Sequence, residues 1–218
     1  MEDRGSVVAI ARADSLSRQA YAIVRRAIRD GVVAPGQVYS ELKLARLLGV
    51  SRTPVREALI ELAQEGAVDK LPQRGFRLRS IGRRERQEVF HLRSLIEGYV
   101  VAELAKSASP DHVQRLSAIL DRQEASEDLG TFLDIDEEFH LAMAELAGLE
   151  RSRRILTGLR SVVWLAGAAA LATSDRDAKV LEEHRAVVDA IAGGNAPGSR
   201  KAIEHHIAQT ANATRKHP

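Results

Sequence analysis

Four side chains in the C-terminal half of this chain are of the types that hold a metal ion: Asp136, His140, His184 and His206. Carboxylate and imidazole groups bind divalent cations in their deprotonated forms, and a carboxylate is costly to bury without a partner. A divalent ion would be a common partner for this set and would keep open coordination positions for a ligand. Imidazole-rich sites suit Zn or Ni, while Mn, Co and Fe also accept these donors.

The four residues would meet only if each pointed into one core, and helical periodicity predicts that they do. Asp136 and His140 are four positions apart, so they lie on adjacent turns of one helix face. His184 and His206 recur at the spacing of apolar residues in two further segments. The stripes contain Leu129, Phe132, Leu133, Met143 and Ala147; Val180, Leu181, Val187, Val188 and Ile191; and Ile203 and Thr210.

Ion pairing is the simpler alternative. Asp136 could hold His140 as an i, i+4 pair, with the other histidines satisfied separately. That explanation is favoured for any one histidine, whereas four inward donors on three helices favour a metal. A metal-dependent hydrolase with Glu137 or Glu138 as base is a further alternative. Both glutamates point off the stripe, and no nucleophile motif accompanies them.

Helical patterns continue from residue 81 to the C-terminus. Breaks rich in Gly, Pro and Ser divide this region into six segments with short links, which predicts an all-α antiparallel bundle over residues 81–218. The expected helices are Arg83–Ser107, Pro110–Ser126, Leu129–Ala147, Ser152–Ala172, Asp175–Ala192 and Ser199–Arg215.

A different pattern occupies residues 49–59, which read Gly-Val-Ser-Arg-Thr-Pro-Val-Arg-Glu-Ala-Leu. Gly49 is suited to end one helix, and Ser51 or Thr53 to cap the next. Pro54 suits the first position of that second helix. The run therefore predicts a helix, a tight turn and a helix.

Basic residues gather around this turn. Arg52 and Arg56 would sit at the positive end of a helix dipole, where a cation is disfavoured unless an anion docks there. Residues 68–78 predict a β-hairpin, with Arg74 at its tip, that could act as a wing on DNA. Residues 1–80 hold 14 Lys and Arg against 9 Asp and Glu, whereas residues 81–218 hold 18 against 21. Double-stranded DNA is therefore the expected partner.

The predicted fold is mainly α. A winged helix–turn–helix of three helices and a small β-hairpin is expected in residues 15–80, after a flexible arm in residues 1–14, and the bundle follows. The absence of cysteine excludes disulfides and thiolate metal sites. We find no secretory signal, and the longest apolar run, residues 162–172, is too short to cross a bilayer. A cytoplasmic location without a membrane partner is expected.

The run from Gly49 to Leu59 resembles the winged helix–turn–helix domain of the GntR family of bacterial transcription regulators, together with residues 29–36 and 41–66 and the Arg74-Gly75 wing. The resemblance implies that Ser51, Arg52, Thr53 and Arg56 contact DNA, with Gly75 at the tip of the wing. Leu42 departs from the pattern, because some relatives carry a DNA-contacting arginine there.

The C-terminal region resembles the FCD ligand-binding domain of the FadR subfamily, and its six segments resemble the shorter VanR-like branch. The resemblance is carried by Leu92-Arg93 through Glu97, Asp136 with Phe139-His140, Glu183-His184, and Ala202 through His206. It implies metal binding by Asp136, His140, His184 and His206, in that chain order.

Relatives of this kind sense small organic acids, so a small carboxylate effector is expected. Arg93 is the candidate contact, and an i, i+4 salt bridge with Glu97 is its alternative role. Arg160 is a weaker candidate for the effector contact.

The sequence thus predicts a DNA-binding regulator rather than an enzyme. We expect a homodimer on a palindromic operator that represses until the effector binds. The effector would tilt the first bundle helix, which follows the wing, and so change the separation of the two DNA-reading helices. A metal-responsive repressor, in which the ion itself is the signal, is the alternative.

Overall fold

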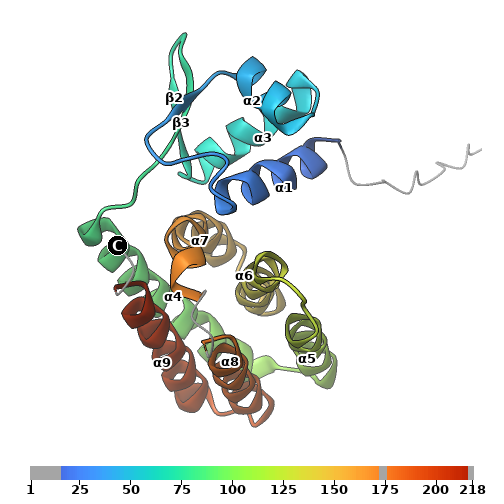
Figure 1. The fold of residues 1–218 in the computed structure, drawn as a ribbon. Helices are drawn as coiled ribbons and strands as arrows, with labels where there is room; N and C mark the ends of the chain where they lie inside the picture. Colours follow the sequence, from blue (N-terminus) through green and yellow to red (C-terminus); the bar gives the residue numbers. More distant parts are fainter. Residues whose placement is uncertain (1–15, 172–175, 216–218) are drawn as a thin grey trace, which may run out of the picture.

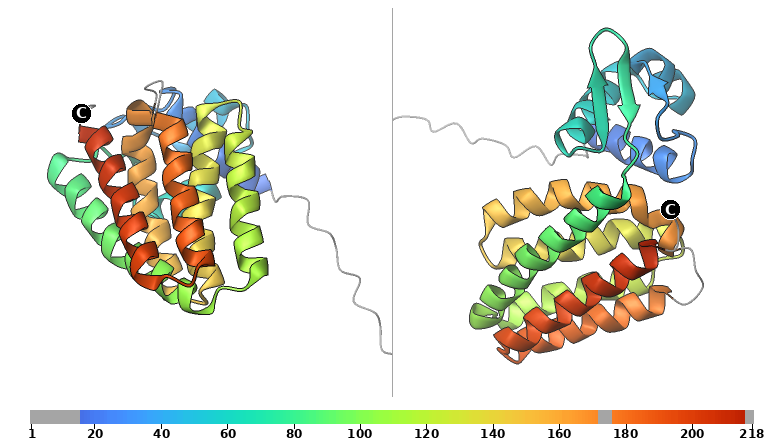
Figure 2. Two further views of the ribbon diagram at one scale, coloured as in Figure 1. Left: turned by 90° about the horizontal axis from the view of Figure 1, so that it is seen from below. Right: turned by 90° about the vertical axis from the view of Figure 1, so that its left-hand side faces the viewer.

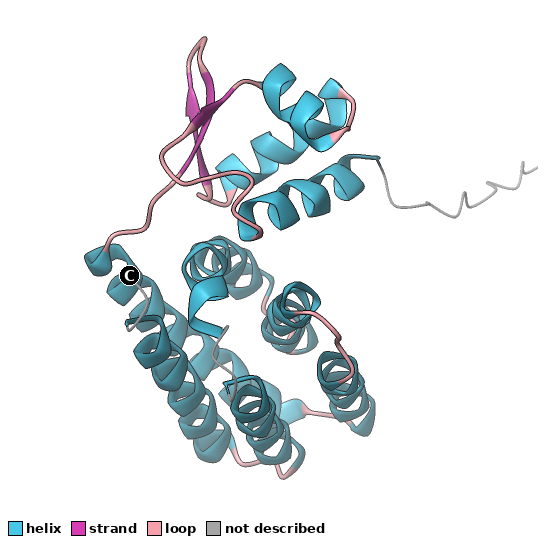
Figure 3. Cartoon of the chain, viewed as in Figure 1, coloured by secondary structure: helices cyan, strands magenta, loops and turns pink. Residues whose placement is uncertain are grey.

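The computed structural model describes residues 16–171 and 176–215 (Figure 1). The predicted N-terminal arm, residues 1–14, lies outside the described residues. Within them the chain is mainly helical, with a small sheet confined to the N-terminal part (Figure 3). We call residues 16–78 the winged domain and residues 83–215 the helical domain.

The winged domain contains three helices and three short strands among the described residues. Their order is α1 (Leu16–Arg29), β1 (Val38–Tyr39), α2 (Glu41–Leu48), α3 (Arg52–Gln64), β2 (Val68–Leu71) and β3 (Gly75–Leu78). The apolar faces of the helices and the inner face of the sheet form one cluster, which includes Val24, Leu44, Val55, Leu62 and Phe76.

Local chemistry sets the turn between α2 and α3. The Ser40 hydroxyl accepts a hydrogen bond from the Lys43 backbone N–H and so caps α2. Gly49 ends α2 in the left-handed conformation, with φ of 67°, as expected for a glycine at this position. Ser51 is the N-cap of α3, whose first residue is Arg52. The prediction that Pro54 takes the first position of this helix is therefore wrong, since it occupies the third.

The sheet has an element that the sequence did not predict. Besides the expected hairpin of β2 and β3, the two-residue strand β1 pairs with β3, which gives the order β1-β3-β2. Tyr39 lies opposite Phe76 in this antiparallel pairing. A strand of two residues has no alternation to read, so periodicity could not reveal it.

Six helices form the described part of the helical domain, in agreement with the predicted number (Figure 2). They are α4 (Arg83–Ser107), α5 (Pro110–Glu124), α6 (Leu129–Leu146), α7 (Glu150–Leu171), α8 (Arg176–Ala192) and α9 (Ala196–Arg215). Helix α9 packs against α4 and α8, and α6 packs against α5 and α7. Their core includes Leu104, Leu116, Phe139, Met143 and Ile203.

Glycine is required at position 75 for a reason within the fold. Gly75 has φ of 113°, and an added Cβ would lie 2.3 Å from the Tyr39 carbonyl oxygen. Both the backbone conformation and the close approach of β1 therefore select glycine there.

We expect Gly75→Ala to destabilise the winged domain by about 2 kcal/mol or more, because neither the strain nor the backbone clash can be relieved by a side-chain movement. Gly82→Ala is the control, since Gly82 has φ of −71° and no atom within 4 Å of an added Cβ. Urea unfolding followed by circular dichroism measures both. Equal unfolding midpoints for the two variants would contradict the requirement for glycine at position 75.

Candidate metal centre and nucleic-acid interface

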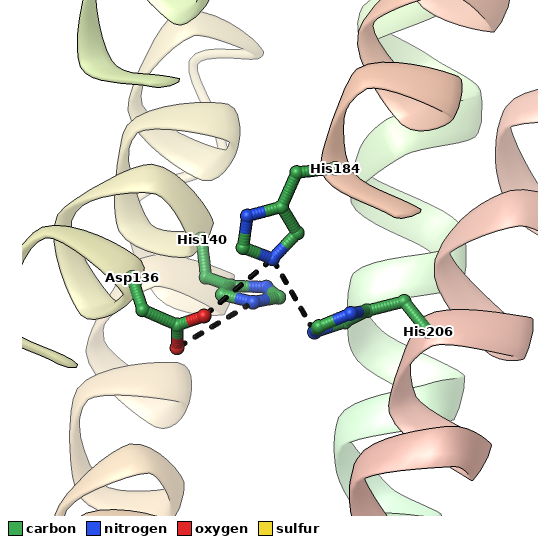
Figure 4. A group of neighbouring side chains, drawn as sticks. All are labelled: Asp136, His140, His184 and His206. Carbon is green, nitrogen blue, oxygen red and sulfur yellow. Dashed lines mark hydrogen bonds and ion pairs between the residues drawn. The ribbon is translucent and has the colours of Figure 1, made fainter. Parts of the chain in front are cut away.

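Three helices bring the four predicted ligand residues together inside the helical domain (Figure 4). Helix α6 supplies Asp136 and His140, α8 supplies His184, and α9 supplies His206. One donor atom from each lies within 4.8 Å of every other. The three imidazoles are fully buried or nearly so, and Asp136 is 9% exposed.

The orientation of each imidazole is set by a polar group behind it. His140 Nδ1 contacts the Glu97 carboxylate, His184 Nδ1 lies 3.0 Å from Gln123 Oε1, and His206 Nδ1 lies 2.8 Å from Glu183 Oε2. A carboxylate or amide oxygen only accepts hydrogen bonds, so each Nδ1 carries the proton and donates it. In the neutral ring, Nε2 is then left with a lone pair, which is the form that binds a metal.

These Nε2 lone pairs face one another rather than a donor. His184 Nε2 lies 3.4 Å from His206 Nε2 and 3.5 Å from Asp136 Oδ1. His140 Nε2 is buried and lacks a hydrogen-bond partner within the described part of the protein. Two ligands at about 2.1 Å from one zinc ion, at a tetrahedral angle, would lie about 3.4 Å apart. The four residues therefore fit a divalent cation.

The ionisation of the cluster agrees with this fit. Burial, assisted by the positive charge of Arg160, holds the pKa of His140 well below its usual range. Burial also lowers the pKa of His184. Burial opposes ionisation of Asp136, but the attraction of Arg160 and the imidazoles outweighs it and holds the pKa of this carboxyl below its usual value. The site thus offers neutral imidazoles at His140 and His184 and one carboxylate at Asp136.

Two buried arginines border the cluster. Arg93 of α4 donates from Nε to Glu97 Oε1 at 2.7 Å, which is the i, i+4 pair that the sequence offered as its alternative role. Its Nη2 is nevertheless buried without a hydrogen-bond partner among the residues that the structure describes. Arg160 of α7 contacts the Asp136 carboxylate through Nη2, while its Nε and Nη1 lack partners among the described residues.

The candidate bases of the hydrolase alternative are engaged elsewhere. Glu137 pairs with Arg25 of α1, and Glu138 pairs with Arg122 on the surface. Both belong to α6, but their carboxylates turn away from the cluster that Asp136 and His140 join. The geometry therefore gives the hydrolase alternative no support.

The sequence indicated the ligand residues but missed the groups that orient them. Glu97, Gln123 and Glu183 come from α4, α5 and α8, and each is recognisable as a partner only once the helices are packed. One signal was available: Gln123 follows Leu116, Ile119 and Leu120 on an apolar helix face, where an amide needs a buried partner.

The second candidate site is the exposed face of the winged domain. Arg52 and Arg56 project from the N-terminal turn of α3, with their side chains 66% and 62% exposed. Ser51 and Thr53 are exposed beside them, and the Ser51 side chain makes no capping hydrogen bond. Arg74 is exposed in the turn between β2 and β3.

A groove of about 450 Å³ separates the start of α3 from this hairpin, and its lining includes Leu42, Arg52, Lys70, Arg74 and Gly75. One acidic residue, Glu41, also lines it. The Glu41 carboxylate accepts from Arg52 Nε at 3.0 Å, and its other oxygen lies 3.7 Å from Arg56 Nε. Glu41 is the first residue of α2 and was not among the predicted site residues.

Comparison with known proteins agrees with both parts of the fold. Residues 16–78 match "Bacterial regulatory proteins, gntR family", and residues 88–209 match the "FCD domain". A regulator from Streptomyces ambofaciens, named for an unstable DNA locus, is 32% identical over 87% of this chain and 81% of its own. The transcriptional repressor RspR of Escherichia coli is 24% identical over 92% of this chain and 90% of its own.

The fold is shared with a solved structure. That of McbR/YncC from E. coli covers 94% of this chain and 99% of its own, with a TM-score of 0.77 at 22% identity. A winged helix–turn–helix joined to an FCD domain defines a class of bacterial transcription regulators. This chain belongs to the GntR family, and its FCD domain fits the FadR subfamily. No helix among the described residues has the length and apolarity that crossing a membrane requires.

For the candidate nucleic-acid interface we expect Arg56→Ala to lower the affinity for double-stranded DNA about tenfold or more, because a phosphate or base-edge contact is lost. If the contact is to phosphate, the slope of log K against log salt concentration should also become shallower by about one. Fluorescence anisotropy over a salt series measures this, with a duplex that the wild-type protein enriches from a random pool.

Arg185→Ala is the control for this change. It removes an equal charge from the exposed surface of α8, at the end of the molecule away from the winged domain (Figure 1). If Arg56→Ala and Arg185→Ala bind the duplex equally well, Arg56 does not contact DNA.

Proposed function

We propose that this protein is a transcriptional repressor whose operator binding is controlled by a small organic acid at a divalent metal site. One observation carries the proposal: imidazole Nε2 atoms of three histidines and the carboxylate of Asp136 converge in a buried space, each histidine ring being held by an acceptor at its Nδ1. A divalent cation among these atoms would bind the lone pairs of the neutral rings and the carboxylate together, and so remove any repulsion between them.

Asp136, His140, His184 and His206 would hold the ion, with Zn or Ni favoured by the imidazole-rich set and Mn, Co or Fe admissible. The bound ion supplies a Lewis-acid centre with open positions for a carboxylate. Arg93 is buried beside Glu97, and no described residue partners its Nη2, so it is the proposed protein contact of that carboxylate. In this proposal the protein residues bind and orient the acid.

Ser51, Arg52, Thr53, Arg56, Arg74 and Gly75 form the proposed DNA contact surface. Two such surfaces in a homodimer would face a palindromic operator, since a two-fold axis in the protein matches one in the DNA. Their separation would then decide operator affinity.

Two connections could carry the state of the metal site to this surface. Residues 79–82 join the wing directly to α4, which is the route expected from the sequence. The other is α6, which carries Asp136 and His140 on one side and contacts α1 with the other. Arg25 Nη2 lies 2.5 Å from Glu137 Oε2.

Arg29 extends this second contact. Its Nη1 donates to the Gly130 carbonyl at 3.0 Å and lies 3.2 Å from Asp134 Oδ1. An added Cβ at Gly130 would lie 2.6 Å from the Arg29 guanidinium, so the absence of a side chain permits the approach. A shift of α6 on effector binding would therefore move the charges that hold α1.

The second candidate function is a metal-responsive repressor, which the same donor set supports. Titration of the metal-free protein with metal, followed by candidate acids, separates the two. If metal alone changes DNA affinity and acids add nothing, the ion is the signal.

We expect His206→Ala to abolish stable metal binding, because it removes one donor from a buried site that has four. The control is His205→Ala, an adjacent and exposed histidine of the same helix. Elemental analysis after dialysis should find about one equivalent in the wild type and in His205→Ala. Equal metal content in His206→Ala, or none in the wild type, would overturn the site.

Glu137→Gln is expected to leave metal binding unchanged but to reduce the effect of the effector on DNA affinity. Allosteric coupling is typically about 5- to 150-fold, and loss of the Arg25 pair should bring the ratio down to a few-fold. Glu138→Gln, which loses a surface pair with Arg122, is the control. DNA affinity is measured with and without an acid found by thermal-shift screening. An undiminished ratio in Glu137→Gln would exclude this route.

A further inference from the structure

We propose that the effector is a dianion with two carboxylate groups, and that Arg160 acts with Arg93 to select it. This inference rests on the metal site of the proposed function. It adds a class of ligand, and it assigns a role to an arginine that the sequence ranked as the weaker candidate.

The buried charges around the cluster balance one another before any metal binds. Among the described residues that are buried around the cluster, Arg93 and Arg160 are balanced by Glu97 and Asp136. The rest of α7, residues 161–171, contains no ionisable side chain. Arg176 and Glu183 form a separate balanced pair.

A divalent ion would therefore leave two uncompensated positive charges in a buried site. Such charge is costly in a medium of low dielectric constant, so a bound anion that cancels it is strongly favoured. A monocarboxylate would cancel one charge, whereas a dicarboxylate would cancel both.

Both arginines also have buried N–H groups that no described residue accepts from. Arg93 and Arg160 are 1% and 4% exposed, yet Arg93 Nη2, Arg160 Nε and Arg160 Nη1 have no hydrogen-bond partner in the described part of the chain. Buried guanidinium N–H groups are normally satisfied, and a missing ligand is one reason for an exception.

The two arginines reach the cluster from different helices. Arg160 of α7 contacts Asp136 directly, and Arg93 of α4 reaches His140 through Glu97. Each guanidinium is therefore already tied to one carboxylate of the protein, and each has N–H groups left over. Two separated anionic groups on one ligand would satisfy both, since a guanidinium binds a carboxylate best through paired N–H donors.

The test uses the full-length, metal-loaded protein and a panel of linear dicarboxylates of three to six carbons. Each diacid is matched with its own monoamide, which keeps the length and hydrogen-bonding capacity but removes one charge. Isothermal titration calorimetry measures affinity, and the metal content after each titration shows that the acid has not stripped the ion. We expect at least one diacid to bind about 30-fold or more tightly than its monoamide.

Two variants test whether Arg160 is responsible for the preference for the diacid over its monoamide. Arg160→Gln should retain metal and bind the monoamide as before, but lose most of the preference for the diacid. Arg160→Lys keeps the positive charge and should retain part of that preference. Metal content and circular dichroism show that each variant is folded.

The outcomes distinguish this inference from the proposed function. Equal affinity for diacids and monoamides, or an undiminished preference in Arg160→Gln, overturns the dianion while the metal and carboxylate proposal stands. A protein that holds metal but binds neither set overturns both the dianion and the carboxylate effector.

Discussion

The helical domain depends on one electrostatic constraint: acceptor atoms are buried facing acceptor atoms. Glu97, Gln123 and Glu183 fix the ring protons of the three histidines on the outer side of the cluster. A neutral ring held in this way turns its Nε2 lone pair inward, and the Nε2 atoms of His184 and His206 lie 3.4 Å apart. In the proposed metal site these orienting groups matter as much as the ligands themselves, since a rotated ring would turn its Nε2 away from the ion.

Helix α6 connects this cluster to the winged domain, because it carries two of the cluster residues and also contacts α1. Asp136 and His140 must keep their positions on one face of this helix, while Glu137 and the Gly130 carbonyl hold α1 on another. A helix is stiff over so short a distance, so a displacement that suits a ligand on one face is also felt on the other. Placing ligands and domain contacts on one rigid element gives a physical basis for coupling.

The sequence could predict those features that depend on helical periodicity or on the residues at helix ends. Asp136 and His140 interrupt an apolar stripe on their own helix, so their inward direction could be inferred without tertiary knowledge. Gly49 and Ser51 mark the turn before α3 in the same local way. Arg160 could not be assigned by this means, because its partner Asp136 lies on another helix and no spacing within α7 points to it.

On the exposed face of the winged domain, an acidic side chain lies among the basic ones. Glu41 lies beside Arg52 and Arg56 at the mouth of the groove, and it is only 19% exposed whereas the arginines are largely in solvent. An acidic group at this point weakens attraction for phosphate in general, because it opposes the positive potential that drives binding without sequence preference. In the proposed complex, DNA that only approaches the surface would compete with Glu41 for the guanidinium groups. DNA that fits α3 and the wing together would gain further contacts, so the carboxylate would shift the balance from general towards geometry-dependent binding.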